Sequence, residues 1–165
     1  MKKYLLLSLL ALFAIPAISN AQEKNFISTG FNVNVMAVDG ESAFSMGIGV
    51  GYHRMLGEKV SLGLNLAYAG SGGVNTLETT LGLAFYGRLA DKFYYVPEID
   101  LGPVFVFDGG GTGFGAMISP LGLEFRPVGK ISFRFNLINL TYLRWAEMNT
   151  LNFMIGPSMS VNFRF

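Results

Sequence analysis

GPSMSVNFRF, residues 156–165, closes the chain and alternates strictly between two kinds of side chain. Every second residue from Met159 to Phe165 is apolar, whereas every second residue from Ser158 to Arg164 is polar. A period of two is typical of a β-strand whose faces meet different surroundings, because successive side chains of a strand point to opposite sides. The ending therefore predicts a strand that extends to the last residue.

The same period recurs along most of the chain after residue 21. In residues 44–53, five large apolar side chains alternate with serine, glycine and histidine. No later stretch has a sustained 3.6-residue apolar period, and none is a long enough apolar run for a membrane helix. Eight strands are predicted, at Phe26–Val38, Phe44–His53, Val60–Ala69, Thr76–Leu89, Phe93–Phe107, Phe114–Arg126, Ile131–Leu143 and Thr150–Phe165.

Short polar or glycine-rich segments separate the predicted strands, as turn chemistry requires. Strands joined in sequence order by short links favour an up-and-down meander over a Greek key. No linker or second domain is visible. Tight turns are predicted at 57–59, 90–92 and 127–130, and the remaining links at 39–43, 70–75, 108–113 and 145–149.

Two kinds of irregularity interrupt the alternation. The adjacent apolar pair Leu137-Ile138 predicts a bulge that flips the face, so that Ile138, Leu140 and Tyr142 continue the apolar row. Proline removes a donor from the ladder, so bulges or shortened ladders are also expected wherever a strand contains one. These positions are Pro97, Pro103, Pro120 and Pro157.

Size and charge decide which row faces inward. Only 14% of the residues are charged, against about a quarter in a usual soluble domain. The second row is mainly Gly, Ser, Asn and Ala, which suits the filling of a narrow eight-stranded interior better than a water-facing surface. The sequence therefore predicts an all-β fold: a closed, eight-stranded, antiparallel, up-and-down transmembrane β-barrel with its large residues facing lipid.

The charged residues within the strands fall in the inward row and comprise four acids and four bases. Opposite charges that are buried together offset each other's desolvation only if they pair and form hydrogen bonds. We therefore predict an ion-pair network that fills the lumen rather than an open aqueous channel. Its predicted members are Glu78, Arg88, Glu98, Asp100, Glu124, Arg126, Arg134 and Arg164.

The first 21 residues carry two lysines, a short apolar run and a small-residue site, which together predict a secretory signal peptide cleaved between Ala21 and Gln22. Residues 22–165 then form one barrel domain. Removal of Lys2 and Lys3 from the twelve basic residues leaves ten, against eleven acidic ones. This balance argues against nucleic acid as a partner, and the absence of cysteine excludes disulfides, thiolate metal sites and a lipoprotein anchor.

The signal peptide, the eight alternating strands and the ending VNFRF resemble the small outer-membrane β-barrel proteins of Gram-negative bacteria, a group often labelled the porin family or outer-membrane β-barrel domain. The resemblance implies export to the cell outer membrane. It also implies that the barrel-assembly machinery reads the last strand during insertion. Phe165, with Phe163 and Val161 in the same row, would be the assembly signal.

Catalytic and cofactor chemistry finds little support in the residue pattern. His53 is the only histidine, and no motif supplies a nucleophile for it. The segment DGGGTGFG, residues 108–115, lacks the following helix of a phosphate-binding loop. Scattered carboxylates make no recognisable metal site. We expect no enzyme activity and no cofactor.

Three functions remain open at this stage. The first is a non-enzymatic integral outer-membrane protein with a filled polar lumen and a structural or envelope-interaction role. The second is a narrow passive pore, suggested by Gly47, Gly49 and Gly51, and the third is a lipid-modifying enzyme that uses His53. Outer-membrane lipid and lipopolysaccharide are the expected surroundings of a monomer, with Arg144 and Trp145 as an interfacial anchor.

Overall fold

The computed structural model of the chain describes residues 24–38, 41–71, 74–107, 111–145 and 152–165. The predicted signal peptide and its cleavage site between Ala21 and Gln22 lie outside these residues. The same holds for the side chain of Trp145. These predictions therefore stay predictions.

The fold is all-β, and its strands lie where the alternation predicts them. Neighbouring strands pair antiparallel around a ring, and the last strand also pairs with the first, which closes the barrel. The strands are β1 (Asn25–Val38), β2 (Glu41–Met55), β3 (Val60–Ser71), β4 (Val74–Phe85), β5 (Gly87–Arg88), β6 (Phe93–Tyr95), β7 (Glu98–Val106), β8 (Gly111–Ser119), β9 (Gly122–Val128), β10 (Ile131–Trp145) and β11 (Asn152–Arg164).

Three of the eight predicted strands are interrupted, and each is observed as two shorter strands. These pairs are β4 with β5, β6 with β7, and β8 with β9. The longer part of each pair belongs to the ring of the barrel. The shorter strands β5 and β6 form a hairpin that pairs onto β9, and β5 is the free end of this extension. The predicted closed eight-stranded meander is confirmed.

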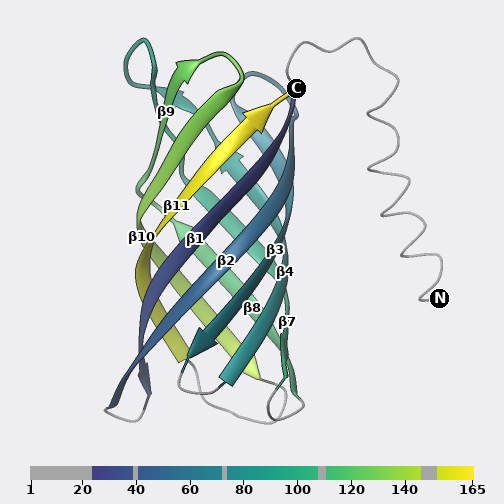
Figure 1. Cartoon of the computed structure of the whole chain (residues 1–165), viewed down its shortest axis with the longest axis vertical. Coiled ribbons are helices and arrows are strands. Elements are labelled where there is room, and N and C mark those ends of the chain that lie inside the picture. Colours follow the sequence, from purple (N-terminus) through teal and green to yellow (C-terminus); the bar gives the residue numbers. More distant parts are fainter. Residues whose placement is uncertain (1–23, 39–40, 72–73, 108–110, 146–151) are drawn as a thin grey trace, which may run out of the picture.

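The two ends of the barrel differ. Residues 56–59, 89–92 and 129–130 make the tight turns at one end, where the last residue, Phe165, also lies. We name this the turn end; it is uppermost in Figure 1. The opposite end, where β1, β3, β7 and β10 finish, is named the loop end.

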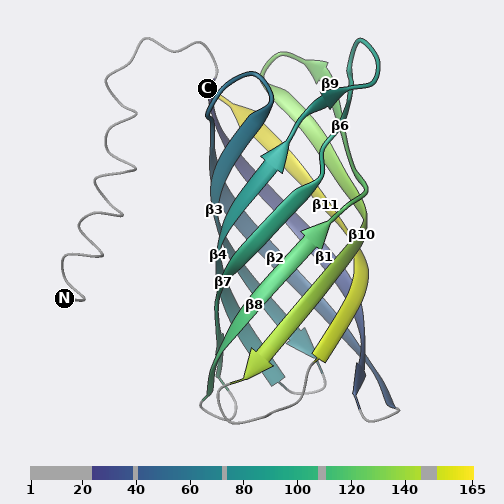
Figure 2. The same cartoon turned by 180° about the vertical axis from the view of Figure 1, so that it is seen from behind.

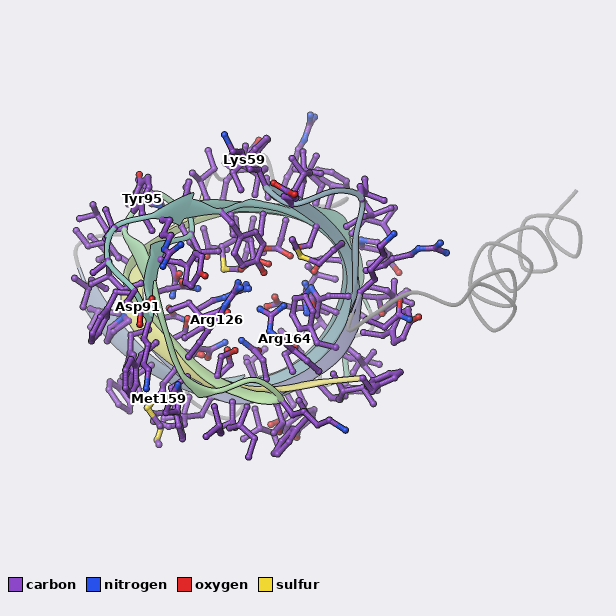
Figure 3. All side chains as sticks on the ribbon, turned by 90° about the horizontal axis from the view of Figure 1, so that it is seen from above. Lys59, Asp91, Tyr95, Arg126, Met159 and Arg164 are labelled. Carbon is purple, nitrogen blue, oxygen red and sulfur yellow. The ribbon has the colours of Figure 1, made fainter. Side chains whose placement is uncertain are left out.

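The faces of the strands follow the predicted assignment. In β2, Ile48 is 67% exposed on the outside, whereas His53 is 3% exposed on the inside. Figure 3 shows the apolar side chains radiating outward and the nitrogen and oxygen atoms gathered in the lumen. Such a continuous apolar exterior suits lipid rather than water. Within residues 24–38, 41–71, 74–107, 111–145 and 152–165, no helix is long and apolar enough to cross a bilayer.

Each of the four prolines interrupts a ladder, as predicted. Pro97 and Pro120 lie at the breaks between β6 and β7 and between β8 and β9. Opposite Pro103, the pairing of β4 with β7 skips two residues on each strand. Opposite Pro157, the pairing of β1 with β11 does the same.

The predicted bulge at Leu137-Ile138 is also present. The register of β10 against β11 jumps from Asn136 to Asn139 on one strand while the partner advances by only two residues. After the bulge, Leu140 faces outward and Asn139 inward. The extra residue therefore keeps large side chains on the lipid face through both halves of the strand.

Candidate functional site

Glu124 on β9 lies at the centre of the most heavily bonded group in the lumen. Its carboxylate is fully buried. Its Oε1 accepts hydrogen bonds from Arg126 Nε at 2.6 Å and from Arg164 Nη2 at 2.7 Å. Its Oε2 accepts one from Arg134 Nη2 at 3.1 Å. Three arginines from β9, β10 and β11 therefore converge on one carboxylate.

Arg134 extends this group across the interior. From β10 it donates to Glu124 on β9, and its Nη1 donates to Glu98 on β7 at 3.1 Å. Its Nη2 also donates to the hydroxyl of Tyr86, which lies between β4 and β5. One buried guanidinium thus links residues from four parts of the barrel wall. We name Glu98, Glu124, Arg126, Arg134 and Arg164 the arginine cluster.

Aromatic rings enclose the arginine cluster toward the turn end. The guanidinium of Arg126 lies 3.9 Å from the ring centre of Tyr94, within cation–π range. The fully buried ring of Phe26 lies 5.0 Å from the guanidinium of Arg164. The sequence pattern assigned no inward role to Phe26 or Tyr86. The one sequence feature that places them inward is their spacing, because each lies an even number of residues from the polar residues of its own strand.

The structure does not bring all the predicted network residues together, and Arg88 is a correction. Its side chain is 63% exposed and pairs with Asp91 at 2.8 Å outside the lumen. The physical reason is that β5 pairs only with β6, so Arg88 lies on an extension beyond the ring. The lumen therefore has three arginines for four carboxylates.

Two of these carboxylates lie apart from the arginines. Asp100 on β7 is 1% exposed and accepts hydrogen bonds from Asn65 Nδ2 at 2.6 Å and from Thr80 Oγ1 at 3.5 Å. Its Oδ2 has no hydrogen-bond partner among the described residues. Glu78, nearer the loop end, is half-buried and has no ion pair with a described residue. These two residues belong to the polar lumen without joining the arginine cluster.

His53 has a partner that sequence reasoning missed. Its Nε2 is hydrogen-bonded to Ser28 Oγ at 2.9 Å. The two residues are 25 positions apart, but β1 pairs with β2 in a register that sets Phe26 opposite His53, which brings Ser28 within reach. The imidazole stacks on the Phe26 ring at 4.5 Å with an interplanar angle of 2°.

Two of the three glycines that suggested a pore, Gly47 and Gly51, are covered by neighbouring side chains. A Cβ added at Gly51 would collide with atoms of Ser28, His53 and Asn65, and one added at Gly47 would collide with Asn32. These glycines therefore provide room for other inward side chains to lie against the wall. They do not by themselves mark an open passage.

No protein-family model matches the chain, and no curated protein matches it. Solved structures match closely in fold. Neisserial surface protein A (NspA) superposes with a TM-score of 0.62 at 10% identity, over 86% of this chain and 97% of that one. The chain has the fold of an outer-membrane β-barrel.

Two further structures share this outer-membrane barrel fold. The outer-membrane enzyme PagL matches with a TM-score of 0.55 at 10% identity, over 85% of this chain and 99% of that one. Ail, the attachment invasion locus protein of Yersinia pestis, matches at 0.50 and 15% identity, over 87% and 100%. The resemblance to outer-membrane barrels is thus confirmed at the level of fold, whereas membership of the porin family stays a prediction.

The chemistry of the lumen is that of charge neutralisation and hydrogen bonding. Among the described residues, no group of three or more His, Asp or Glu side chains is arranged to hold a metal ion. The Ser28–His53 pair is the single nucleophile–base contact that these residues show, and it lies beneath Phe26. The dominant feature remains the arginine cluster.

Proposed function

We propose that the protein is a non-enzymatic integral protein of the Gram-negative outer membrane, a monomeric barrel whose lumen is closed by the arginine cluster. The cross-lumen reach of Arg134, from β10 to Glu98 on β7 and Glu124 on β9, carries this proposal. A guanidinium held by two carboxylates and a tyrosine hydroxyl cannot leave the passage without breaking several buried charge-assisted contacts.

The apolar exterior and the outer-membrane barrel fold support the location. In such barrels the short turns face the periplasm, which assigns the turn end to that side. The role in the envelope is structural, or an interaction with outer-membrane lipid and lipopolysaccharide. Phe163 and Phe165 are exposed on the outside of the last strand and Val161 is half-buried there, where a factor that reads this row during insertion has access.

Planar-bilayer recording of the refolded protein tests the closed lumen. We expect the wild type to insert, to show heat-modifiable electrophoretic mobility and to give no stable single-channel steps. The double variant Glu124→Ser with Arg134→Ser removes the central bridge while retaining small polar groups, and discrete conductance steps are expected from it.

The matched control is Arg88→Ser with Asp91→Ser, which removes an exposed ion pair outside the lumen and should stay silent. Stable steps from the wild type would overturn the closed lumen in favour of the narrow passive pore. Wild-type protein that stays in the soluble periplasmic fraction would contradict the membrane location.

The Ser28–His53 hydrogen bond favours a second candidate, a lipid-modifying hydrolase. A hydroxyl within reach of an imidazole is the arrangement of an activated nucleophile. Against it, His53 is 3% exposed and stacked under Phe26, and neither Ser28 nor His53 lines the pocket found in the described part of the barrel. The non-enzymatic function is therefore the better supported.

Comparison of lipid A from cells that express the wild type or His53→Phe separates these candidates. Phenylalanine keeps an aromatic ring for the stack on Phe26 but removes the base, so we expect an unchanged lipid A profile. Ser28→Ala is the matched second variant. Mass spectra that show a modification in wild-type cells and its loss in both variants would establish the enzyme instead.

A further inference from the structure

The turn end of the lumen holds a pocket of about 770 Å³ directly above the arginine cluster. Arg126 and Arg164 lie in its lining, and Figure 3 shows both side chains extending into the lumen as seen from this end. Residues from the three tight turns complete the wall. The pocket therefore opens toward the aqueous side of the barrel rather than toward the lipid-facing surface.

The charges that line this pocket are predominantly basic. Lys24 and Lys92 join Arg126 and Arg164, against the two carboxylates of Glu58 and Asp91. Asp91 is already engaged, because it accepts from Arg88 at 2.8 Å. The arginine cluster beneath adds one further arginine, Arg134, and two glutamates, so the pocket and the cluster together hold five basic side chains against four acidic ones. The pocket and its base thus have an excess of positive charge.

Donor groups at the base remain unused. Arg164 is 7% exposed, and its Nε has no hydrogen-bond partner among the described residues. The same holds for Nη2 of Arg126, although Nε of this residue is bonded to Glu124. A buried donor without a partner is costly. Guanidinium groups with free N–H bonds match the geometry of an oxyanion better than that of any other small ligand.

We propose that this turn-end pocket binds a water-soluble oxyanion of the phosphate type, with Arg126 and Arg164 at its base and Lys24 and Lys92 at its rim. The anion offsets the excess positive charge and lies against the guanidinium of Arg126, whose side chain is 23% exposed. The lysines add long-range attraction, which weakens as ionic strength rises. This site is independent of whether the lumen below it conducts.

Isothermal titration of the refolded protein in phosphatidylcholine nanodiscs with sodium pyrophosphate, and then with inorganic phosphate, tests the proposal. Chloride at matched ionic strength is the blank. We expect saturable binding of one anion per barrel. Arg126→Gln should weaken it at least tenfold, because a hydrogen bond to a charged group is worth at least about 1.5 kcal/mol and tenfold in affinity corresponds to about 1.4 kcal/mol.

Lys59→Gln is the control, since it removes one positive charge at the turn end from an exposed residue that does not line the pocket. It should change the affinity less than twofold. Arg126→Lys retains the positive charge but lacks the planar guanidinium group with its paired N–H donors. This variant should bind pyrophosphate with intermediate affinity. Heat-modifiable mobility verifies that each variant is folded, and Lys92→Gln offers a rim variant whose folding does not depend on the cluster.

Three results would overturn the proposal. These are no saturable heat above the chloride blank, equal losses for Arg126→Gln and Lys59→Gln, or an Arg126→Lys variant as weak as Arg126→Gln. A fourth outcome concerns the source of the anion. If phosphatidylglycerol nanodiscs abolish pyrophosphate binding while phosphatidylcholine nanodiscs permit it, a lipid headgroup occupies the pocket and the soluble-anion assignment fails.

Discussion

Glu124→Gln is expected to lower the free energy of unfolding by about 3–5 kcal/mol, the usual loss when one partner of a buried ion pair is removed. The carboxylate is the common acceptor for Arg126, Arg134 and Arg164. Glutamine has nearly the same shape, but its amide group carries no charge. Its NH₂ also brings two hydrogen-bond donors into a site where the surrounding guanidinium groups are already donors. The cluster would then hold three arginines against Glu98 alone.

Denaturant unfolding of the refolded protein in micelles, followed by the heat-modifiable band on gels, measures this loss. Asp91→Asn is the matched control, because it removes the carboxylate of an ion pair whose side chains are 63% and 85% exposed. Exposed pairs contribute little, so its effect should stay below about 1 kcal/mol. Equal losses for the two variants would contradict a buried, energetically central Glu124.

Adding Arg164→Gln to Glu124→Gln should recover part of the stability. The second substitution removes one of the charges that the first leaves unpaired. A double-mutant cycle gives the coupling energy directly, because the two side chains are in contact at 2.7 Å. Strictly additive losses would show that the two residues do not form one unit.

Gly156→Ala is expected to destabilise the barrel by about 2–3 kcal/mol, at the upper end of the usual range for overpacking. A Cβ at Gly156 would lie far closer to the backbone carbonyl oxygen of Val33 than a van der Waals contact, so a strand and not merely a side chain must shift. This contact lies between β11 and β1, the pair that closes the barrel.

Gly57→Ala provides the comparison, because a Cβ at Gly57 meets nothing within 4 Å. Its effect on unfolding should be within about 0.5 kcal/mol, as for most surface substitutions. The same denaturant titration measures both variants. A Gly156→Ala protein as stable as Gly57→Ala would mean that the β11–β1 seam is looser than this close approach indicates.

The alternation of large and small side chains was sufficient to predict the barrel and its inward row. Strand periodicity is set by the backbone itself, so Ile48 and His53 could be assigned to opposite faces from their spacing alone. The bulge at Leu137-Ile138 was predictable for the same reason, because only an extra residue keeps Leu140 facing outward.

The contents of the lumen were predicted less well, because they depend on which strands lie opposite each other across the barrel. Arg88 has the right parity but belongs to β5, which stands clear of the ring. Phe26 is a large apolar residue, yet it faces inward beside the arginines. Ser28 meets His53 only through the β1–β2 register. Such contacts depend on the shear of the barrel and on the register between strands, and neither can be derived from the two-residue period of the sequence.

The proline interruptions described above have a consequence for assembly errors. A strand that slides by one residue would turn its whole apolar row toward the lumen, and a uniform ladder offers little resistance to larger slips. Here Gly102-Pro103 and Gly156-Pro157 fit only where the neighbouring strand also leaves its pairing, opposite Thr79 and Val33. A misaligned pair would leave a carbonyl acceptor opposite proline without a donor and would crowd a backbone carbonyl against glycine. These local losses of hydrogen bonding therefore favour a single register in the β4–β7 and β1–β11 pairs, the second of which closes the barrel.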